Sequence, residues 1–437
     1  MNKPRLLPWL VAVIPILIAV LYLRRSDVAT PGAVLNGLGR LTGIGGLAFL
    51  LVSAALSCRV PGFDRPFGGL TKLWQTHHKL GGTALLLVLA HPVLLALGAA
   101  EVSITAAART LVPARLDWSA VSGWSALLVM LVFLAPSFSF FGSPEYQRWR
   151  NLHRLAAVAV VAALAHTTLA ARTIAEPLNT IMWSGLAAAA VAAVAWRFVF
   201  SRRKGRLSYV VERVAHPASG LVELSLAPRA DALTYEPGQF VYLAPYDHAL
   251  RAGFGEEHPY TLSSSPTESL LRVAIKDLGD ASRAIQRIST GSEVRIEGPY
   301  GAFFPRGDTH EPELWIAGGI GITPFLARAR HLAATESHRA GPVDVNLIYG
   351  VQDETRAHFL DELERLAERT PGFRVTMHYF YREGPLQHEF LARHCPDFTA
   401  RTAYVCGPVP LIELAEQLLA AAGVPRARIR TEEFTLL

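Results

Sequence analysis

Cysteine is scarce in this sequence, with 3 residues in 437, and no two of them form a CxxC pair. Iron–sulfur clusters need several thiolate ligands, while structural zinc sites and disulfide frameworks need cysteines in paired patterns. Cys58, Cys395 and Cys406 offer no such pattern. The sequence therefore argues against all three kinds of site.

Charge is scarce in the first 200 residues, which are rich in Ala, Leu and Val, and the apolar runs there contain no acidic residue. An ion-coupled transporter usually needs a buried acid, so this absence disfavours one. The net charge of +6 does not indicate nucleic-acid binding, because the basic clusters flank apolar runs, as membrane topology requires. Since residues 201–437 have the mixed charge of a soluble protein, we predict domains at 1–204, 205–308 and 309–437.

Six apolar runs have roughly the 17–25 residues that cross a bilayer as a helix. They are Leu6–Leu23, Leu41–Ser57, Lys79–Ala99, Ser119–Phe141, Leu155–Ala171 and Leu178–Phe200. Lys3 and Arg5 resemble the start of a signal peptide, but no clean small-x-small cleavage site follows, so we expect a retained helix. Most basic loop residues lie on the same side of the predicted membrane as Lys3 and Arg5. Because cytoplasmic loops carry an excess of Lys and Arg, we predict a multi-pass inner-membrane protein with a cytoplasmic soluble half.

Histidine is absent from every loop of the membrane half, yet five of the 15 histidines lie in two apolar stretches, Trp74–Pro92 and Arg150–Ala171. His77 and His153 mark one edge of these stretches, and His91 and His166 lie about 20 Å further along, at 1.5 Å per residue. Imidazole is a common axial ligand of haem iron, so we predict two bis-His haems, pairing His77 with His153 and His91 with His166. Polar contacts between helices are the alternative.

Helical phase supports one of these spacings better than the other. A separation of 14 residues, as between His77 and His91, turns an ideal helix by about −40° and keeps both on one face. A separation of 13 residues, as between His153 and His166, places the two side chains roughly 140° apart around an ideal helix. Both can then bind haem only with a helix distortion or with differently angled haems. His78 also lies 13 residues from His91, so it ranks below His77 and is kept as the alternative ligand.

The soluble half begins with strand patterns typical of a small antiparallel β-barrel, at Leu207–Arg213, Leu221–Leu226 and Phe240–Ala244. The stretch His258–Ser264 reads HPYTLSS. An aromatic residue followed by a hydroxyl residue can cover a flat ring and hydrogen-bond the polar edge of that ring. Alone, this stretch would be an ordinary strand with a Ser-rich turn. In Lys276–Ile285, Gly279 and Ser282 offer donors to a pyrophosphate.

A strand, a Gly-rich turn and a helix follow at Leu314–Arg328 and predict an α/β nucleotide-binding domain. A lone Gly-rich turn is a weak signal. Here it follows a flavin-like motif, and a later strand ends in a second small-residue turn. The candidate nucleotide-binding residues are Gly318, Gly319, Gly321, Thr323, Pro324, Cys406, Gly407 and Pro408.

The order PGQF, HPYTLSS, GDAS, EGPYG resembles the FAD domain of ferredoxin–NADP reductase type, as found in the ferric reductase and NADPH oxidase superfamily. The resemblance implies that the flavin motif binds FAD, with Thr261 near the reactive edge of the isoalloxazine. It places Cys406 near the nicotinamide and Phe434 over the flavin, although a buried small residue is the alternative for Cys406. The flavin motif falls on His258, Pro259, Tyr260, Thr261 and Ser263.

The membrane half resembles the ferric reductase-like transmembrane domain of the same superfamily. The resemblance rests on His77-x-x-Leu80-Gly81, His91-Pro92 and Leu152-His153-Arg154-Leu155 with His166. Together the two resemblances cover nearly the whole chain.

The cofactors implied are FAD, two b-type haems and NADPH or NADH as donor. A nicotinamide gives up two electrons at once and haem iron takes one, so a flavin between them is the required converter. No arginine directly follows Gly350 to hold a 2′-phosphate, although Arg356 or Arg382 could reach it. Membrane lipid surrounds the spans, and no obligatory protein partner is evident.

The expected acceptor on the outer face is O2, giving superoxide, or a ferric chelate. Leu95 stands where some animal oxidases carry a further histidine, which weakens the oxidase interpretation. The alternative function is a membrane-docked flavin reductase that passes electrons to a protein partner or quinone, with structural histidines.

Overall fold

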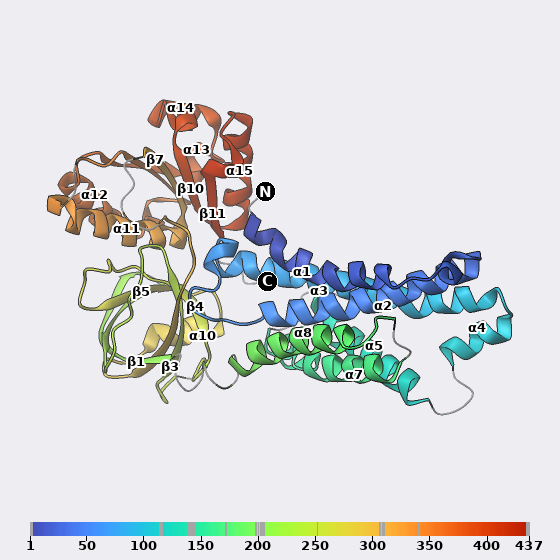
Figure 1. Cartoon of the computed structure of the whole chain (residues 1–437). Coiled ribbons are helices and arrows are strands. Elements are labelled where there is room, and N and C mark those ends of the chain that lie inside the picture. Colours follow the sequence, from blue (N-terminus) through green and yellow to red (C-terminus); the bar gives the residue numbers. More distant parts are fainter. Residues whose placement is uncertain are drawn as a thin grey trace. The chain divides into compact units, whose positions relative to one another are not determined.

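The computed structural model describes residues 3–112, 117–137, 146–170, 173–196, 199, 201, 206–250, 252–305, 307, 311–338 and 341–433. Contacts divide the chain into two compact units (Figure 1). The first contains Met1–Cys58 and Lys72–Phe198, and the second contains Arg59–Thr71 and Val199–Leu437. This division departs from the predicted boundary at residue 204, because the connection at Arg59–Thr71 belongs with the soluble half.

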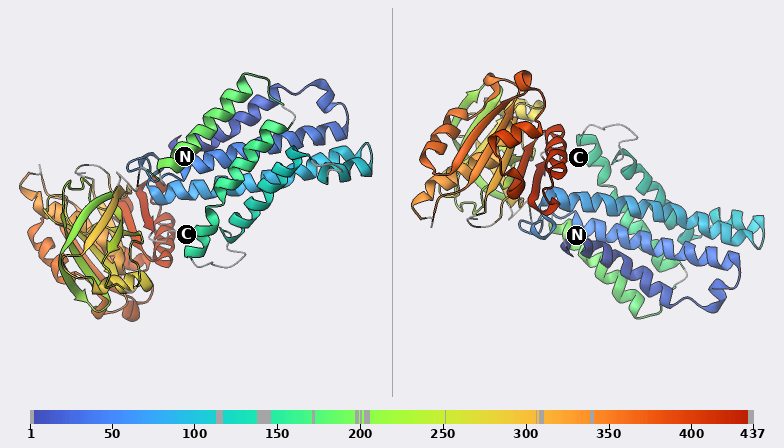
Figure 2. Two further views of the ribbon diagram at one scale, coloured as in Figure 1. Left: turned by 90° about the horizontal axis from the view of Figure 1, so that it is seen from below. Right: turned by 90° about the horizontal axis from the view of Figure 1, so that it is seen from above.

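The first unit is helical, and its long helices lie side by side in both views of Figure 2. Its helices are α1 (Lys3–Leu21), α2 (Pro31–Leu56), α3 (Leu70–Ala100), α4 (Ile104–Leu111), α5 (Trp118–Leu134), α6 (Tyr146–His153), α7 (Ala156–Leu169) and α8 (Leu178–Ala195). Helix α2 begins ten residues before the predicted run because Thr30 caps it, its hydroxyl accepting a bond of 3.1 Å from Ala33 N.

Among the described residues, five helical segments are long and apolar enough to cross a membrane. They are Pro31–Leu56, Leu70–Ala100, Trp118–Ser137, Asn151–Leu169 and Leu178–Ala195. The apolar part of α1, Leu6–Leu21, is shorter; its 16 residues extend about 24 Å, against a hydrocarbon core of about 30 Å. The sixth span therefore stays a prediction.

The stretch Arg150–Ala171, which includes the predicted fifth span, is interrupted between its two histidines. Helix α6 ends at His153, a turn occupies Arg154–Leu155, and α7 starts at Ala156. Of the two explanations for the 13-residue spacing, a helix distortion or differently angled haems, the structure contains a helix distortion. The break changes the angular relation of His153 to His166, and both rings lie beside a histidine of α3.

The second unit contains a six-stranded antiparallel sheet whose order is β4-β3-β6-β1-β2-β5 (Figure 1). A bridge between Leu262 and Val273 links the chain after β4 to β5. Alternating side chains such as Val222, Leu224 and Val241 fill its core. The strands are β1 (Arg206–Ala218), β2 (Leu221–Pro228), β3 (Phe240–Tyr246), β4 (His258–Thr261), β5 (Leu271–Lys276) and β6 (Glu293–Tyr300), and the short helix α10 (Asp280–Ala284) follows β5.

A five-stranded parallel sheet follows, with the order β11-β10-β7-β8-β9. Both faces of β7 are buried, with Trp315 and Ala317 in one core and Leu314 and Ile316 in the other. The strands are β7 (Glu313–Gly318), β8 (Val345–Val351), β9 (Phe373–Tyr379), β10 (Thr402–Gly407) and β11 (Ile429–Glu433). The helices are α11 (Thr323–Ala334), α12 (Leu360–Arg369), α13 (Phe380–Glu383), α14 (His388–His394) and α15 (Val409–Ala421).

A buried ion pair joins the connection between α2 and α3 to the antiparallel sheet. Arg59 donates through Nε and Nη2 to the two carboxylate oxygens of Glu297, at 2.7 Å each, and both residues are 1% exposed. Arg59 also donates to Glu257 at 2.7 Å and lies 3.7 Å from the centre of the Tyr242 ring. Asp64 accepts a bond of 2.9 Å from Gly301 N. The connection is therefore an integral part of the flavin-type sheet.

Replacing Arg59 with Ala should lower the free energy of unfolding of the second unit by about 3–5 kcal/mol, because the buried Glu297 loses its bidentate partner and Arg206 Nε, 3.8 Å away, is too distant for a hydrogen bond. Urea titration of the full chain in detergent measures this. The exposed pair Arg283–Asp277, whose arginine side chain is 71% exposed, provides the control, and Arg283→Ala should change the value by less than about 1 kcal/mol. Equal effects of the two substitutions would contradict the stabilising role assigned to the buried Arg59–Glu297 pair.

Candidate functional site

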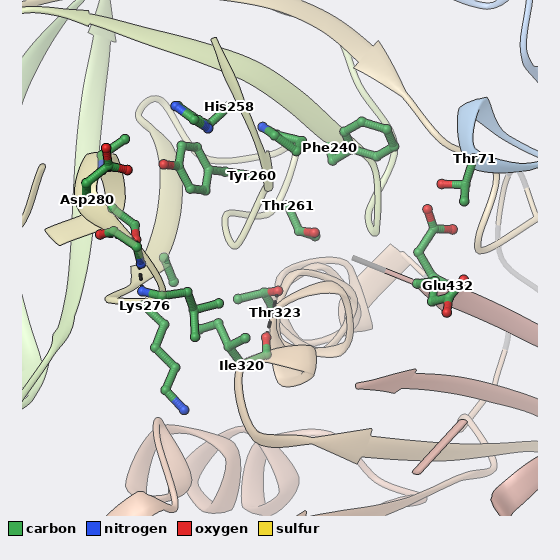
Figure 3. Close-up of a pocket in the computed structure, with 17 residues that line it drawn as sticks. Thr71, Phe240, His258, Tyr260, Thr261, Lys276, Asp280, Ile320, Thr323 and Glu432 are labelled. Carbon is green, nitrogen blue, oxygen red and sulfur yellow. Dashed lines mark hydrogen bonds between the residues drawn. The ribbon is translucent and has the colours of Figure 1, made fainter. Parts of the chain in front are cut away.

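A cavity of about 330 Å³ lies in the second unit, between β4, α10 and the start of α11 (Figure 3). Four consecutive residues of β4 line it, His258, Pro259, Tyr260 and Thr261, opposite Ile320 and Thr323 of the parallel-sheet domain. Burial raises the pKa of Tyr260, which stays a neutral phenol at physiological pH. The cavity thus presents an aromatic ring, a hydroxyl and an imidazole from one strand.

The turn before α10 lines the same cavity through Gly279 and Ser282. Ser282 Oγ accepts bonds of 2.8 Å from the N–H groups of Leu278 and Gly279, so this hydroxyl organises the turn. Lys276, at the end of β5, adds a cation to the lining that suits a phosphate.

Ser263 does not line the cavity. It is fully buried, and its hydroxyl donates to Glu223 Oε1 at 2.7 Å. The chain leaves β4 after Thr261, so the predicted flavin motif divides into residues that face the cavity and residues that do not.

Sequence reasoning did not single out several residues of the cavity lining, among them Lys276, Thr71 and Glu432. Lys276 had a signal, a cation at the end of a strand beside a Gly-containing turn. Glu432 lies two residues before Phe434, and Phe434 itself is outside the described residues. Thr71 had no signal, because it lies between two apolar helices in the sequence.

The Gly-rich turn after β7 packs backbone to backbone against the turn after β10. A Cβ at Gly321 would lie 2.4 Å from Cys406 O, and one at Gly318 would lie 2.9 Å from Pro408 Cδ. Gly319 has φ +53°, which favours glycine. Pro324 occupies the first turn of α11, and Thr323 Oγ1 donates to Ile320 O at 3.1 Å. Gly407 lies against Gly318, so the predicted nucleotide residues gather at the carboxyl edge of the sheet.

Cys406 lies within the core of the parallel sheet, is 0% exposed and does not line the cavity. Burial raises the pKa of its thiol well above the usual value, so the sulfur is a neutral thiol at physiological pH. Its predicted place beside a nicotinamide stays a prediction.

In the first unit, the imidazole rings form the two predicted pairs. The ring centres of His77 and His153 are 6.1 Å apart, and those of His91 and His166 are 6.0 Å apart. His91 and His166 line a second cavity of about 330 Å³, together with Gly43, Gly123 and Arg40. His78 forms neither pair.

Three of these imidazoles bond through Nδ1 to a backbone carbonyl of a neighbouring helix. The partners are Ser53 O for His77 (2.8 Å), Gly39 O for His91 (2.7 Å) and Ser119 O for His166 (2.8 Å). A carbonyl can only accept, so Nδ1 carries the proton and Nε2 keeps its lone pair. His153 packs on Trp149, and its buried Nδ1 has no hydrogen-bond partner among the described residues.

This arrangement fits an axially ligated haem. Two metal–imidazole bonds of about 2 Å place the ring centres about 6 Å apart, as both pairs are. Glycines stand where the supporting helices meet the ligands: a Cβ at Gly43 would lie 2.7 Å from His91 Nδ1, and one at Gly123 would lie 2.9 Å from His166 Nδ1. No group of three or more metal-binding side chains occurs in the described part of the chain, and a bis-His site needs none.

Gly321→Ala should raise the KM for the nicotinamide nucleotide at least tenfold, because the new methyl meets the Cys406 carbonyl and shifts the turn. Initial rates of nucleotide-dependent ferricyanide reduction measure this. Gly341→Ala is the matched control, since a Cβ there has no atom within 4 Å. An unchanged KM in Gly321→Ala would remove this turn from the binding site.

Three family models match the chain. They are the ferric reductase like transmembrane component over residues 42–164, an FAD-binding domain over 207–303 and an oxidoreductase NAD-binding domain over 315–417. Their order agrees with the helical unit, the antiparallel sheet and the parallel sheet.

Curated relatives match the soluble half. The ferredoxin reductase component of 3-ketosteroid-9-alpha-monooxygenase from Mycolicibacterium smegmatis is 34% identical over 214 residues, 48% of this chain and 58% of that protein. A flavohemoprotein from Rhizobium meliloti is 27% identical, over 55% of this chain and 60% of its own length. The chain thus spans less than two thirds of these relatives.

A solved structure, flavohemoglobin from Malassezia yamatoensis with bound FAD and heme, superimposes with a TM-score of 0.51 at 18% identity. The match covers 93% of this chain and 99% of that one, and it supports the fold alone. The family models carry the assignment: in this chain a ferric reductase-like transmembrane domain is joined to an FAD-binding domain and an NAD-binding domain of the ferredoxin–NADP reductase type.

Proposed function

We propose that this NAD(P)H-dependent oxidoreductase passes electrons from a cytoplasmic nucleotide through FAD and two bis-His haems to an acceptor on the outer face of the inner membrane. The observation that carries the proposal is the pairing of four histidines at two positions along the helices, with ring centres 6.1 and 6.0 Å apart. Three of the four Nδ1 atoms donate to backbone carbonyls of neighbouring helices, which leaves Nε2 of each of these rings with its lone pair.

A bound FAD would supply the conversion from hydride to single electrons, which a nicotinamide cannot perform. In the first cavity Tyr260 and Thr261 would cover its ring and hydrogen-bond its edge, and His258 and Pro259 shape the strand that carries them. Lys276 would place a cation near the pyrophosphate. The family resemblance implies that Phe434 would cover the flavin until the nicotinamide enters.

His77 and His153 would hold one haem on the cytoplasmic side, and His91 and His166 would hold the other on the outer side. Haem iron bound there would supply single-electron chemistry. No Phe, Tyr or Trp lies between the two histidines of either stretch, so an aromatic relay between the haems would come from another helix, and Phe49 and Phe133 are the candidates. Phe133 contacts His153 with ring centres 5.4 Å apart, whereas Phe49 packs on Trp9. Phe133 is therefore the better candidate for an aromatic relay between the two levels. Six spans and a closed barrel complete the proposed architecture.

The outer acceptor is O2 or a ferric chelate, and a dismutase-sensitive signal with purified protein distinguishes the two. The donor is NADH or NADPH. The two arginines that could read a 2′-phosphate both have carboxylate neighbours, with Arg356 Nε 3.8 Å from Asp353 and Arg382 Nη1 3.1 Å from Glu354. Comparison of rates with the two nucleotides decides between them.

The names of the relatives favour a second candidate function. The Mycolicibacterium smegmatis relative is a ferredoxin reductase component of a monooxygenase. By analogy, the flavin half of this chain would reduce a protein partner or quinone while the histidines serve only in helix packing. Purified protein without a haem spectrum would support this function over the first.

Gly123→Ala should remove up to half of the bound haem, because the new methyl lies 2.9 Å from His166 Nδ1 and displaces this ligand of the outer haem alone. The reduced-haem absorbance of solubilised protein measures haem per polypeptide. Gly185→Ala on α8 is the control, since a Cβ there has no atom within 4 Å. His166→Ala should remove the outer haem and leave the FAD content unchanged. Full haem content in both variants would end the haem proposal.

A further inference from the structure

The residues after Thr261 contact the parallel-sheet domain instead of the flavin cavity. Ser263, Ser264 and Ser265 are all buried, at 0–1% exposure. Ser265 Oγ lies 3.3 Å from His331 Nδ1, and Ser263 O accepts a bond of 2.7 Å from Arg330 Nη1. Both partners belong to α11, so the end of the flavin motif is attached to the helix that begins in the cavity.

Arg330 is the centre of a four-residue group that we call the Arg330 cluster, formed with Glu223, Ser263 and Glu362. Its Nη1 donates to Glu223 Oε1 at 3.0 Å, and its Nε and Nη2 donate to the two oxygens of Glu362 at 2.7 Å each. Ser263 Oγ donates to the same oxygen of Glu223. The cluster therefore joins β2, the end of the flavin motif, α11 and α12.

The cluster is buried and charged. Arg330 is 5% exposed and Glu223 is 8% exposed. Burial alone would lower the pKa of Arg330, but its bond to Glu362 and the charge of Glu223 hold the pKa above its usual value. Burial would likewise raise the pKa of Glu362, but the bond from Arg330 holds it below its usual range. A buried cation is tolerated only with such partners, so its position is tightly fixed.

The Arg330 cluster lies close in sequence to residues on both sides of the flavin cavity. Thr261 and Thr323 both line the flavin cavity, from β4 and α11 (Figure 3). Ser263 follows Thr261 by two residues, and Arg330 follows Thr323 by seven, about 10 Å along a helix. Fixing Arg330 against Ser263 and Glu223 therefore fixes the nucleotide-binding turn relative to the flavin strand.

We propose that Arg330 is a positioning residue for hydride transfer, which locks the nucleotide-binding domain against the flavin strand so that the nicotinamide meets the flavin at the reactive distance. This rests on the proposed flavin and nucleotide sites, but not on the haems. Small displacements of reacting atoms lower rates strongly, so the cluster acts on the rate of transfer more than on nucleotide affinity.

Arg330→Met tests this proposal in the full-length, FAD-loaded protein. Anaerobic flavin bleaching by NADH and by NADPH gives the rate per bound FAD, and ferricyanide turnover gives kcat and KM without requiring haem. We expect kcat per bound FAD to fall at least tenfold with KM changed less than threefold. Arg330→Lys keeps the charge and should recover part of the rate.

Two measurements do not depend on turnover. Hydrogen–deuterium exchange at 263–265 and along α11 should increase in Arg330→Met and stay unchanged in the antiparallel sheet. The long-wavelength charge-transfer absorbance of oxidised nicotinamide stacked on reduced flavin should weaken.

Arg401→Met is the matched control. Arg401 is also buried, at 3% exposure, and bonds to Asp397 at 2.8 Å and to Asp344 at 3.0 Å, with no contact to the flavin strand. It should lower the melting temperature as Arg330→Met does while leaving kcat per bound FAD unchanged. The proposal is overturned if Arg330→Met keeps its kcat per bound FAD, or if Arg401→Met loses as much. Absence of flavin bleaching in the unmodified protein would instead overturn the proposed function.

Discussion

A neutral imidazole keeps a lone pair for a metal on one nitrogen while the other carries the proton, and a hydrogen-bond acceptor beside that N–H fixes the tautomer. For His77, His91 and His166 the acceptors are backbone carbonyls of α2 and α5, helices that carry none of the paired histidines. Gly43 and Gly123 allow these helices to approach the rings closely. The positions of the histidines are thus set by small residues and free carbonyls on neighbouring helices as much as by α3 and α7.

In the second unit, the buried guanidinium groups of Arg59 and Arg330 likewise depend on hydrogen-bond partners. Arg59 connects the segment between α2 and α3 to β6, and Arg330 connects α11 to β2 and the end of the flavin motif. Each takes a bidentate carboxylate, which offsets the cost of burying the charge. These pairs fix the edges of the flavin cavity from two directions, so the strand His258–Thr261 is held by contacts that lie outside the cavity itself.

The sequence predicted much of this arrangement because the signals were local. The pairing of His77 with His153 was predicted from two matched stretches. The 13-residue spacing of His153 and His166 predicted either a helix distortion or differently angled haems, and a helix break lies at Arg154–Leu155. The HPYT and Gly-rich motifs likewise combined strand, turn and helix signals in short stretches.

What the sequence did not predict depends on contacts between distant residues. Glu297 lies 238 residues after Arg59, and no periodicity connects them. Ser263 is a residue type that often binds cofactors, but the chain turns away from the cavity after Thr261. The Ser263 hydroxyl therefore donates a hydrogen bond to Glu223 instead. The predicted boundary at residue 204 did not separate residues 59–71 from the helices, because hydropathy groups a loop with the apolar runs beside it in the sequence. In the structure this loop belongs to the second unit, where its Arg59 forms an ion pair with the sheet.

Rapid mixing of the purified protein with NADH or NADPH in the absence of oxygen tests the central claim, that electrons pass from nucleotide to flavin and then to the paired histidine sites. Absorbance should first show loss of oxidised flavin and then, in a slower phase, the appearance of reduced haem. Haem reduction that precedes flavin reduction, or flavin reduction with no haem signal at any time, would contradict the account.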